Sequence, residues 1–422
     1  MYRKLVLFVL CVTLVLTTAG CYAQVEKPEQ STSVPADTTP RDTTLPREPP
    51  QPQADGPHFA ITHVEPFGVK ANTNIRLSVA GLGKGGYPTP DGEAMYLASS
   101  TVSYFDPDSG TEFAACPIAG CTHKDDACPG RIPGLTAFCA DDTYWYAFTM
   151  VEDVLRLLRV DPSTGDRTVL HTWKYGAYFG DGILSSGYIL ADICSFLEQD
   201  RTSSYVSIDL ADGTVREFAR SDEMGQGRLA GGDSNTVIME WLTYSEPLLT
   251  FEQWLEANPG KSEEDYFTYV DRLYYQDNVV TLRSFDLTTG DYRDLPNTQG
   301  ARLFSDPNIS YDEYFVYRQG DSVMLGSFSG EESRTVFTAD GIINAWLMDG
   351  RVFILRQDGA HLQEWVADMA GGEAKLLHDY GESDGVVFSA VREINDYFIG
   401  SGSSYISKAD YYAGNFDKAN SF

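Results

Sequence analysis

Basic residues are scarce in this chain of 422 residues, because 31 Lys and Arg stand against 61 Asp and Glu and give a formal net charge of −30 at pH 7. Such a charge repels phosphate backbones and anionic lipid surfaces, so nucleic acid is excluded as a partner. Only seven Cys are present, too few for a scaffold built on disulfides. The hydrophobic share of 42% is ample for a core and excludes an acidic disordered protein.

Signatures of catalysis are also missing. The six His residues lie outside any nucleophile motif, and no G-x-S-x-G, H-E-x-x-H or Walker sequence occurs. Acidic residues are so numerous that no two of them can be singled out as a glycosidase pair. The sequence therefore favours a binding protein, with a hydrolase or lyase acting on polysaccharide as the alternative.

Long apolar runs are confined to the N-terminus. Two basic residues precede an apolar stretch over residues 5–16, which is shorter than the roughly 20 residues of a membrane span. The following Thr-Ala-Gly-Cys, ending at Cys21, resembles the lipobox of bacterial lipoproteins. That resemblance implies a signal peptide over residues 1–21 and a lipid on Cys21, although Thr18 stands where the family usually has Leu. Ordinary secretory cleavage near Ala23 is the alternative.

Residues 22–57 are rich in Pro, Thr, Ser and Gln and contain almost no large apolar side chains. Such a segment cannot bury enough surface to fold, and its prolines keep it extended. We therefore expect a tether that holds a monomeric globular domain, residues 58–422, at the outer face of the cytoplasmic membrane.

The globular part repeats itself. An apolar strand ends in Asp, three residues and a Gly follow, and another strand begins, because Asp accepts turn hydrogen bonds and Gly takes a positive φ. The copies carry Asp106, Asp161, Asp209, Asp286, Asp368 and Asp410, and Gly326 replaces Asp in a seventh. An aromatic or β-branched burst precedes each copy. Successive copies lie 40 to 55 residues apart, except for one spacing of 77.

Each unit has room for about four short antiparallel strands, which predicts an all-β fold, a β-propeller of seven blades. Six or eight blades remain open, and two β-sandwiches are the rival architecture. The Asp-x-x-x-Gly turns join the third and fourth strands, so they share one face. The irregular loops are expected on the opposite face.

The first irregular loop contains Cys116, Cys121, His123 and Cys128 in the spacing C-x4-C-x-H-x4-C. Three thiolates and one imidazole can close a tetrahedral zinc site. Disulfides among Cys116, Cys121, Cys128 and Cys139 compete with it in an exported protein, as do free thiols. Cys194, in another loop, is expected to be a buried inert thiol or a partner of a cluster Cys.

The second irregularity is an insertion over residues 244–277 in the fourth unit. Thr250 and Ser262 are predicted to begin two short helices. The insertion either packs its aromatics against the propeller rim or presents them to a partner, an exported protein or a glycan, since flat rings bury large areas at low entropy cost. The candidate partner-binding residues are Trp241, Tyr244, Phe251, Trp254, Tyr266, Tyr269 and Tyr274.

With these features together, residues 60–422 resemble the uncharacterised propeller lipoproteins of Gram-positive, mostly anaerobic bacteria, which have TolB-like or YWTD-like blades. Many of those proteins carry a similar C-x4-C-x-H-x4-C stretch in their first blade, which Cys116, Cys121, His123 and Cys128 match, whereas residues 117–120 differ. The resemblance implies a fold and a location and no activity. Metal or redox sensing through the Cys-His loop is a further alternative.

Overall fold

The structure is a computed structural model of the chain, and it describes residues 72, 74–79, 86–124, 126–195, 202–382, 386–400 and 403–422. All of them belong to one compact unit, residues 57–422. The predicted signal peptide and tether, with Cys21, lie outside the described residues. No helix in the described part of the chain is long and apolar enough to cross a membrane.

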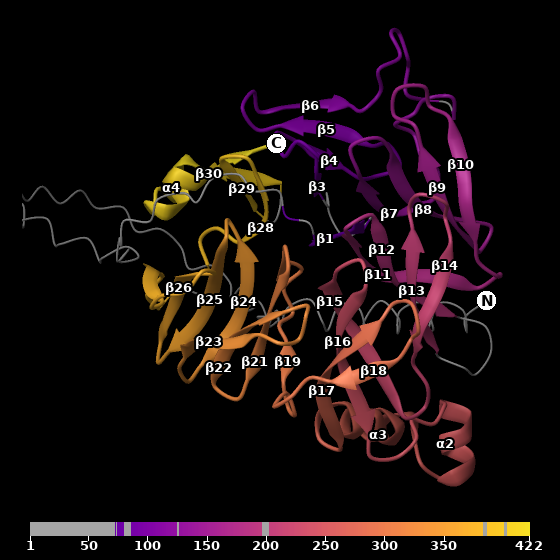
Figure 1. The fold of residues 1–422 in the computed structure, drawn as a ribbon, viewed down its shortest axis with the longest axis vertical. Helices are drawn as coiled ribbons and strands as arrows, with labels where there is room; N and C mark the ends of the chain where they lie inside the picture. Colours follow the sequence, from indigo (N-terminus) through magenta and orange to yellow (C-terminus); the bar gives the residue numbers. More distant parts are fainter. Residues whose placement is uncertain are drawn as a thin grey trace, which may run out of the picture. The chain divides into compact units, whose positions relative to one another are not determined.

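Seven antiparallel sheets surround a central axis (Figure 1), which confirms the seven-bladed β-propeller. Blade 1 contains β3 (Gly86–Pro88), β4 (Met95–Leu97), β5 (Ser103–Asp106) and β6 (Thr111–Ala114). Blade 2 contains β7 (Leu135–Ala140), β8 (Trp145–Val151), β9 (Val154–Val160) and β10 (Arg167–Thr172). Blade 3 contains β11 (Ala177–Ser185), β12 (Tyr188–Ser195), β13 (Ser203–Asp209) and β14 (Val215–Arg220).

The remaining blades follow the same order. Blade 4 contains β15 (Gly225–Gly232), β16 (Thr236–Tyr244), β17 (Asn278–Asp286) and β18 (Tyr292–Asp294). Blade 5 contains β19 (Arg302–Leu303), β20 (Ser310–Tyr311), β21 (Tyr314–Gln319), β22 (Ser322–Ser327) and β23 (Ser333–Thr338), and both β19 and β20 pair with β21. Blade 6 contains β24 (Ile342–Met348), β25 (Arg351–Asp358), β26 (His361–Asp368) and β27 (Lys375–Asp379). Blade 7 contains β28 (Ala390–Ile394), β29 (Tyr397–Gly400), β30 (Ser404–Ser407) and β31 (Asn420–Ser421).

The repeated turn has the predicted local chemistry. In the copies that begin at Asp106, Asp161, Asp209, Asp286 and Asp368, the carboxylate accepts a hydrogen bond from the backbone N–H two residues later, at 2.7–2.9 Å. The glycines that close these turns have positive φ, for example 83° at Gly165. The Asp410 copy was predicted to be the same turn, and that prediction is wrong. There the chain forms the helix α4 (Lys408–Tyr412), capped by Ser407, and a one-turn 3-10 helix η1 (Phe416–Lys418).

Large side chains fill the seams between neighbouring blades, as the high aromatic content predicts. Between blades 6 and 7, for example, the rings of Phe353 and Phe398 meet edge to face with centroids 6.0 Å apart. Blade 7 closes against blade 1 by the same means, because Phe105 and Phe422 stack at 4.0 Å. In the described part of the chain, the first and last blades share no strand.

Two further strands, which the repeat pattern does not predict, lie along the inner edges of two blades. β1 (Asn74–Arg76) pairs with β11 of blade 3, and β2 (Ser78–Val79) pairs with β7 of blade 2. The side chain of Asn74 also binds the backbone of Asp312 in blade 5 and of Gly232 in blade 4. Blade 7 reaches the same segment when Arg392 donates to the Arg76 carbonyl at 2.9 Å. One short segment thus connects five blades near the axis.

A buried group of charges fixes blade 7 to blade 6. The Lys408 ammonium lies 3.0 Å from an Asp349 carboxylate oxygen and 2.9 Å from one of Glu393. Arg351 and the Tyr412 hydroxyl both donate to the other Asp349 oxygen at 2.7 Å. Asp349 lies in the turn between the first two strands of blade 6, whereas Lys408 and Tyr412 belong to α4. Helix α4 is therefore part of the closure of the ring.

Candidate metal centre

The Cys loop, residues 115–134, joins the outer strand of blade 1 to the inner strand of blade 2. Its second half is held by backbone bonds between Val102 and Gly130 and between Ser100 and Ile132. Arg167, at the start of β10, donates to the carbonyls of Cys128 and Arg131 at 2.8 and 2.6 Å. These bonds place the end of the loop in the seam between blades 1 and 2.

The prediction that this loop lies on the face opposite the Asp-x-x-x-Gly turns holds only for part of it. A Cβ placed on Gly165, in such a turn of blade 2, would lie 3.1 Å from Pro129. The turn after the third strand of a blade reaches the outer strand of the preceding blade, as Gly213 does with Leu170. The loop therefore extends along the outside of the seam. Pro129, in its second half, contacts the face that carries the turns.

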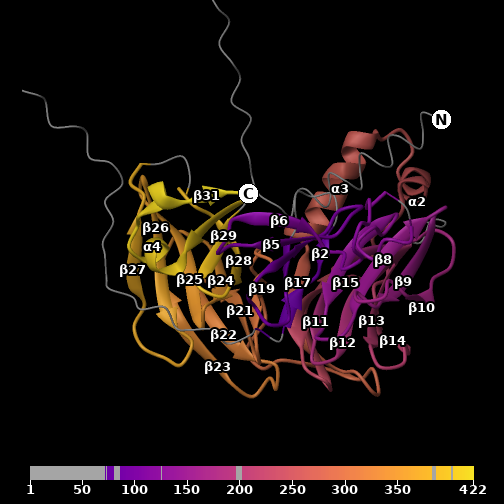
Figure 2. The same ribbon diagram turned by 90° about the horizontal axis from the view of Figure 1, so that it is seen from above.

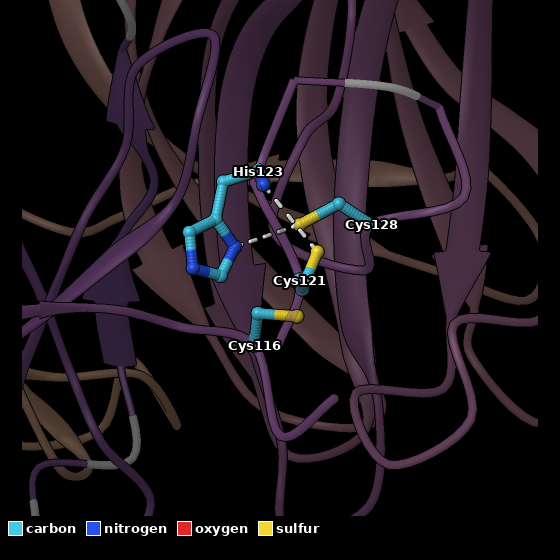
Figure 3. Close-up of side chains that lie close together, drawn as sticks. All are labelled: Cys116, Cys121, His123 and Cys128. Carbon is cyan, nitrogen blue, oxygen red and sulfur yellow. Dashed lines mark hydrogen bonds between the residues drawn. The ribbon is translucent and has the colours of Figure 1, made fainter. Parts of the chain in front are cut away.

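Four side chains of this loop converge (Figure 3). One ligand atom from each of Cys116, Cys121, His123 and Cys128 lies within 4.8 Å of all the others. The His123 Nδ1 is 3.3 Å from the Cys128 sulfur. Ligands at zinc distances of about 2.3 Å for sulfur and about 2.0 Å for nitrogen lie roughly 3.5 Å apart across a tetrahedral angle. The His123–Cys128 separation therefore fits a zinc shell, and the other ligand atoms of the predicted quartet lie close enough to be drawn onto the same ion.

The local backbone explains why these residues meet. The Cys121 N–H donates to the Ile118 carbonyl at 3.2 Å and closes a turn, in which Gly120 takes a φ of 76°. His123 has a φ of 57°, an uncommon left-handed value for a residue with a side chain. The His123 N–H also points at the Cys121 sulfur, 3.4 Å away, and such N–H···S bonds support a metal-bound thiolate.

Without a metal ion, the electrostatics of the cluster favour the protonated thiols. The pKa of the Cys116 thiol is raised to about 11, mainly by desolvation, with smaller contributions from the nearby thiols of Cys128 and Cys121. Cys128 is fully buried. Three sulfur atoms this close lose their protons together only when a metal ion neutralises them, and binding then releases those protons.

The other two described cysteines lie apart from the quartet. Cys139 is fully buried on β7, where burial raises the pKa of its thiol well above the usual value. Cys194 lies on β12, near Ser203 and Asp192, and burial raises the pKa of its thiol to about 12. All five described cysteines are thiols in the structure. Cys194 thus has the environment of an inert thiol.

The insertion forms the two predicted helices, α2 (Phe251–Ala257) and α3 (Glu263–Tyr275), and part of α3 projects beyond the strands in Figure 2. Thr250 and Ser262 cap them with the reciprocal bonds of capping boxes. β16 and β17 pair directly up to Tyr244 and Asn278. The insertion is therefore an addition to a complete blade, between its second and third strands.

The aromatic residues predicted to bind a partner pack mainly on one another and on blade 4. Trp241, Tyr244, Trp254 and Tyr266 are buried, and Phe251, Tyr269 and Tyr274 are partly buried. The Trp254 and Tyr266 rings, for example, have centroids 5.7 Å apart. This arrangement corresponds to the first of the two interpretations of the insertion, in which it packs its own aromatics against the propeller rim. Four of the seven residues have little surface left for a partner.

The aromatic residues that α3 does expose are Phe267 and Tyr275, and Tyr275 is 73% exposed. At about 100° per residue, Phe267 lies about 100° and Tyr275 about 180° around the helix from the buried Tyr266. Between the helices lies a groove of about 550 Å³ that includes Trp254, Lys261, Tyr269 and Arg272. Sequence reasoning missed the two exposed rings, although the helical period separates them from the buried set.

A second cavity, of about 280 Å³, lies at the axial end framed by the loops between the first and second strands of several blades. It is thus at the end away from the insertion. Two of its carboxylates already accept structural hydrogen bonds. Asp141 accepts from the Thr143 and Tyr144 N–H groups and the Tyr146 hydroxyl, and Glu393 accepts from Lys408. No component of this cavity was predicted from the sequence as a site.

Several solved structures are similar to the chain at low sequence identity. No family model and no curated protein matches the chain. Similar solved structures include TolB from Acinetobacter baumannii, with 12% identity, a TM-score of 0.32, and coverage of 80% of this chain and 78% of the other. An oligogalacturonate lyase in complex with manganese has 11% identity, a TM-score of 0.36, and coverage of 71% and 77%. An uncharacterised protein from Listeria monocytogenes has 10% identity, a TM-score of 0.36, and coverage of 62% and 71%.

Proposed function

We propose that the chain is a zinc-carrying binding protein of the cell surface, in which the metal fixes the loop between blades 1 and 2. The observation that carries the proposal is the convergence of Cys116, Cys121, His123 and Cys128 within 4.8 Å. Four protein ligands leave no position open for substrate, which is the arrangement of a structural zinc rather than a catalytic one. The role of the metal is therefore to hold exposed residues 117–120 in one conformation for contact with a partner.

Zinc is favoured over other metals by the ligand set. Three soft thiolates and one imidazole suit zinc, whereas calcium and magnesium prefer oxygen ligands. The expected result is one zinc per full-length chain purified under anaerobic conditions, measured by elemental mass spectrometry. Alkylation should label Cys116 and Cys121 only after chelation. An intact Cys116–Cys121 disulfide in protein taken directly from cells, without metal, would contradict the proposal.

We further infer that Cys21 is lipidated and that residues 22–57 tether the propeller to the outer face of the cytoplasmic membrane of a Gram-positive bacterium. The supports are the lipobox-like Thr-Ala-Gly-Cys and the Pro- and Thr-rich composition. The Cys21→Ala variant is expected to move from the membrane fraction to the medium, since it loses the acceptor of the lipid. Continued retention in a high-salt membrane pellet would show that something else anchors the chain.

The partner is proposed to be an exported protein or a glycan that contacts the insertion. Exposed Phe267 and Tyr275 supply flat rings, and the groove beside Trp254 and Tyr269 carries the charged ends of Lys261 and Arg272. Such combinations of aromatic and polar groups suit partners with both apolar and hydroxyl-bearing surfaces. The insertion can serve this purpose without altering the blade, because β16 and β17 already pair beneath it.

A further inference from the structure

The three sulfur atoms of the Cys-His quartet differ in how far solvent reaches them. Cys116 and Cys121 are partly exposed, whereas Cys128 is fully buried. One ligand atom of each lies within 4.8 Å of the others, and the Cys116 thiol interacts with the thiols of both Cys121 and Cys128. A small molecule dissolved in water therefore reaches two neighbouring sulfur atoms, Cys116 and Cys121, and not the third.

The backbone around the buried sulfur is fixed to the rest of the propeller. The Cys128 carbonyl accepts a hydrogen bond from the Arg167 side chain at 2.8 Å and from the Arg131 N–H at 3.1 Å. Arg167 belongs to β10, in blade 2, so the position of Cys128 is set by a strand outside the loop. A movement of Cys128 would break these bonds in the seam between blades 1 and 2.

The segment between the two reachable sulfur atoms is held mainly by itself. Residues 117–120 are exposed. The Cys121 N–H donates to the Ile118 carbonyl at 3.2 Å, and the Ile118 N–H donates to the Cys116 sulfur. Both bonds stay within the loop, so Cys116 and Cys121 can approach each other without a change in the blades.

A disulfide between these two residues and a bound zinc exclude each other. Two thiolates on one zinc lie roughly 3.8 Å apart, because each Zn–S bond is about 2.3 Å and the angle is tetrahedral. A disulfide brings its two sulfur atoms to about 2.05 Å. It also withdraws two of the four ligands, and His123 and Cys128 alone do not complete the shell. Formation of the disulfide therefore releases the metal.

We propose that Cys116 and Cys121 form an oxidation site, at which a peroxide converts two zinc-bound thiolates into a disulfide and frees the zinc. The inference rests on the proposed zinc centre. One thiolate attacks a peroxide oxygen, breaks the O–O bond and becomes a sulfenic acid as one hydroxide leaves. The second thiolate attacks that sulfur and displaces the other hydroxide. Two electrons pass from the thiolates to the peroxide, and the zinc leaves as Zn²⁺.

The reaction acts on an exposed apolar part of the surface. Ile118, in the turn of the loop, is 42% exposed, and Phe113, on β6 just before the loop, is 54% exposed. His123 has a left-handed φ of 57°, which is costly for a residue with a side chain, and release of the metal removes a bond that supports this conformation. The site thus links a peroxide to the conformation of the loop that we propose contacts a partner.

The test treats the full-length, zinc-loaded protein with excess hydrogen peroxide and follows zinc with a chromogenic chelator. About one zinc per chain should be released, as expected for one four-ligand site. A peptide that contains a Cys116–Cys121 bond should appear in the digest prepared without reduction. Amide hydrogen exchange between Ile118 and His123 should become faster. Dithiothreitol followed by zinc should restore the loaded form, since thiol exchange reopens the disulfide.

Cys194→Ser is the matched control, because Cys194 lies outside the quartet and its loss should change neither the zinc release nor the disulfide. Zinc that is bound at the start and retained after peroxide would overturn the oxidation site and leave the zinc centre intact. Release without a Cys116–Cys121 bond, or with Cys128 as the partner, would also overturn it. Protein that carries no zinc before peroxide is added would instead contradict the zinc centre itself.

Discussion

Replacement of Lys408 by methionine is expected to lower the free energy of unfolding by about 3–5 kcal/mol, because a buried carboxylate loses the cation that neutralises it. The Lys408 side chain is 4% exposed and the Asp349 side chain fully buried. Arg351 still pairs with Asp349 in the variant, so Glu393 bears most of the loss. Urea unfolding at constant slope measures the change.

The effect should depend on pH in a defined direction. Burial raises the pKa of Glu393, and the charge of Lys408 opposes that shift, so the substitution raises this pKa further. At low pH, a carboxyl group with a raised pKa is protonated in both the folded and the unfolded protein and costs no folding stability. It destabilises the fold as the pH rises through its folded pKa. The loss of stability in Lys408→Met should therefore be larger at pH 8 than at pH 5.

Lys418→Met is the matched control for this prediction. Lys418 also pairs with an acid, Asp410 at 2.5 Å, but its side chain is 57% exposed, and such exposed pairs contribute little to stability. Adding Glu393→Gln to Lys408→Met should recover part of the stability, since the unpaired charge disappears. Equal losses in the two lysine variants would show that α4 is not held to blade 6 by buried charge.

Replacement of Cys128 by serine is expected to weaken zinc binding by more than about 100-fold. Loss of a group that only supports a metal ligand costs up to about 100-fold, and loss of the ligand itself should cost more. Cys128 is fully buried, and its sulfur lies 3.3 Å from the His123 Nδ1, so no solvent ligand takes its place without moving the loop. Competition with a zinc-binding dye measures the affinity. Gly130, buried in the seam, should then show faster amide hydrogen exchange.

Cys194→Ser provides the comparison, because Cys194 lies on β12 and outside the quartet. Its zinc affinity should equal that of the wild type. If Cys128→Ser and Cys194→Ser bind zinc equally well, the metal is held elsewhere and the quartet is only a group of neighbouring thiols.

Features that repeat or lie close together in the sequence could be predicted. The Asp-x-x-x-Gly turns recur because each needs only local hydrogen bonds and one positive φ, and they led to the correct number of blades. The Cys-His quartet spans 13 residues from Cys116 to Cys128, so its spacing limits the geometry on its own. The helix caps at Thr250 and Ser262 are local for the same reason.

Features made by residues far apart in the sequence could not be predicted. Tyr87 and Arg392 line one cavity only because blades 7 and 1 are neighbours in the closed ring. The repeat pattern does not predict β1 and β2, since they lie outside the repeated units and pair along the inner edges of complete blades. The Asp410 copy matches the turn pattern, but Lys408 two residues earlier enters a buried charge group and the segment becomes α4. Exposure of the insertion aromatics depended on which stripe of α3 faces blade 4.

X-ray absorption at the zinc edge of the native full-length protein tests the zinc centre most directly. The proposed site predicts three sulfur neighbours at about 2.3 Å and one nitrogen at about 2.0 Å, with the imidazole signature of His123 lost in a His123→Ala variant. A shell of only nitrogen and oxygen, or a shell unchanged in that variant, would contradict the assignment of Cys116, Cys121, His123 and Cys128 as the metal centre.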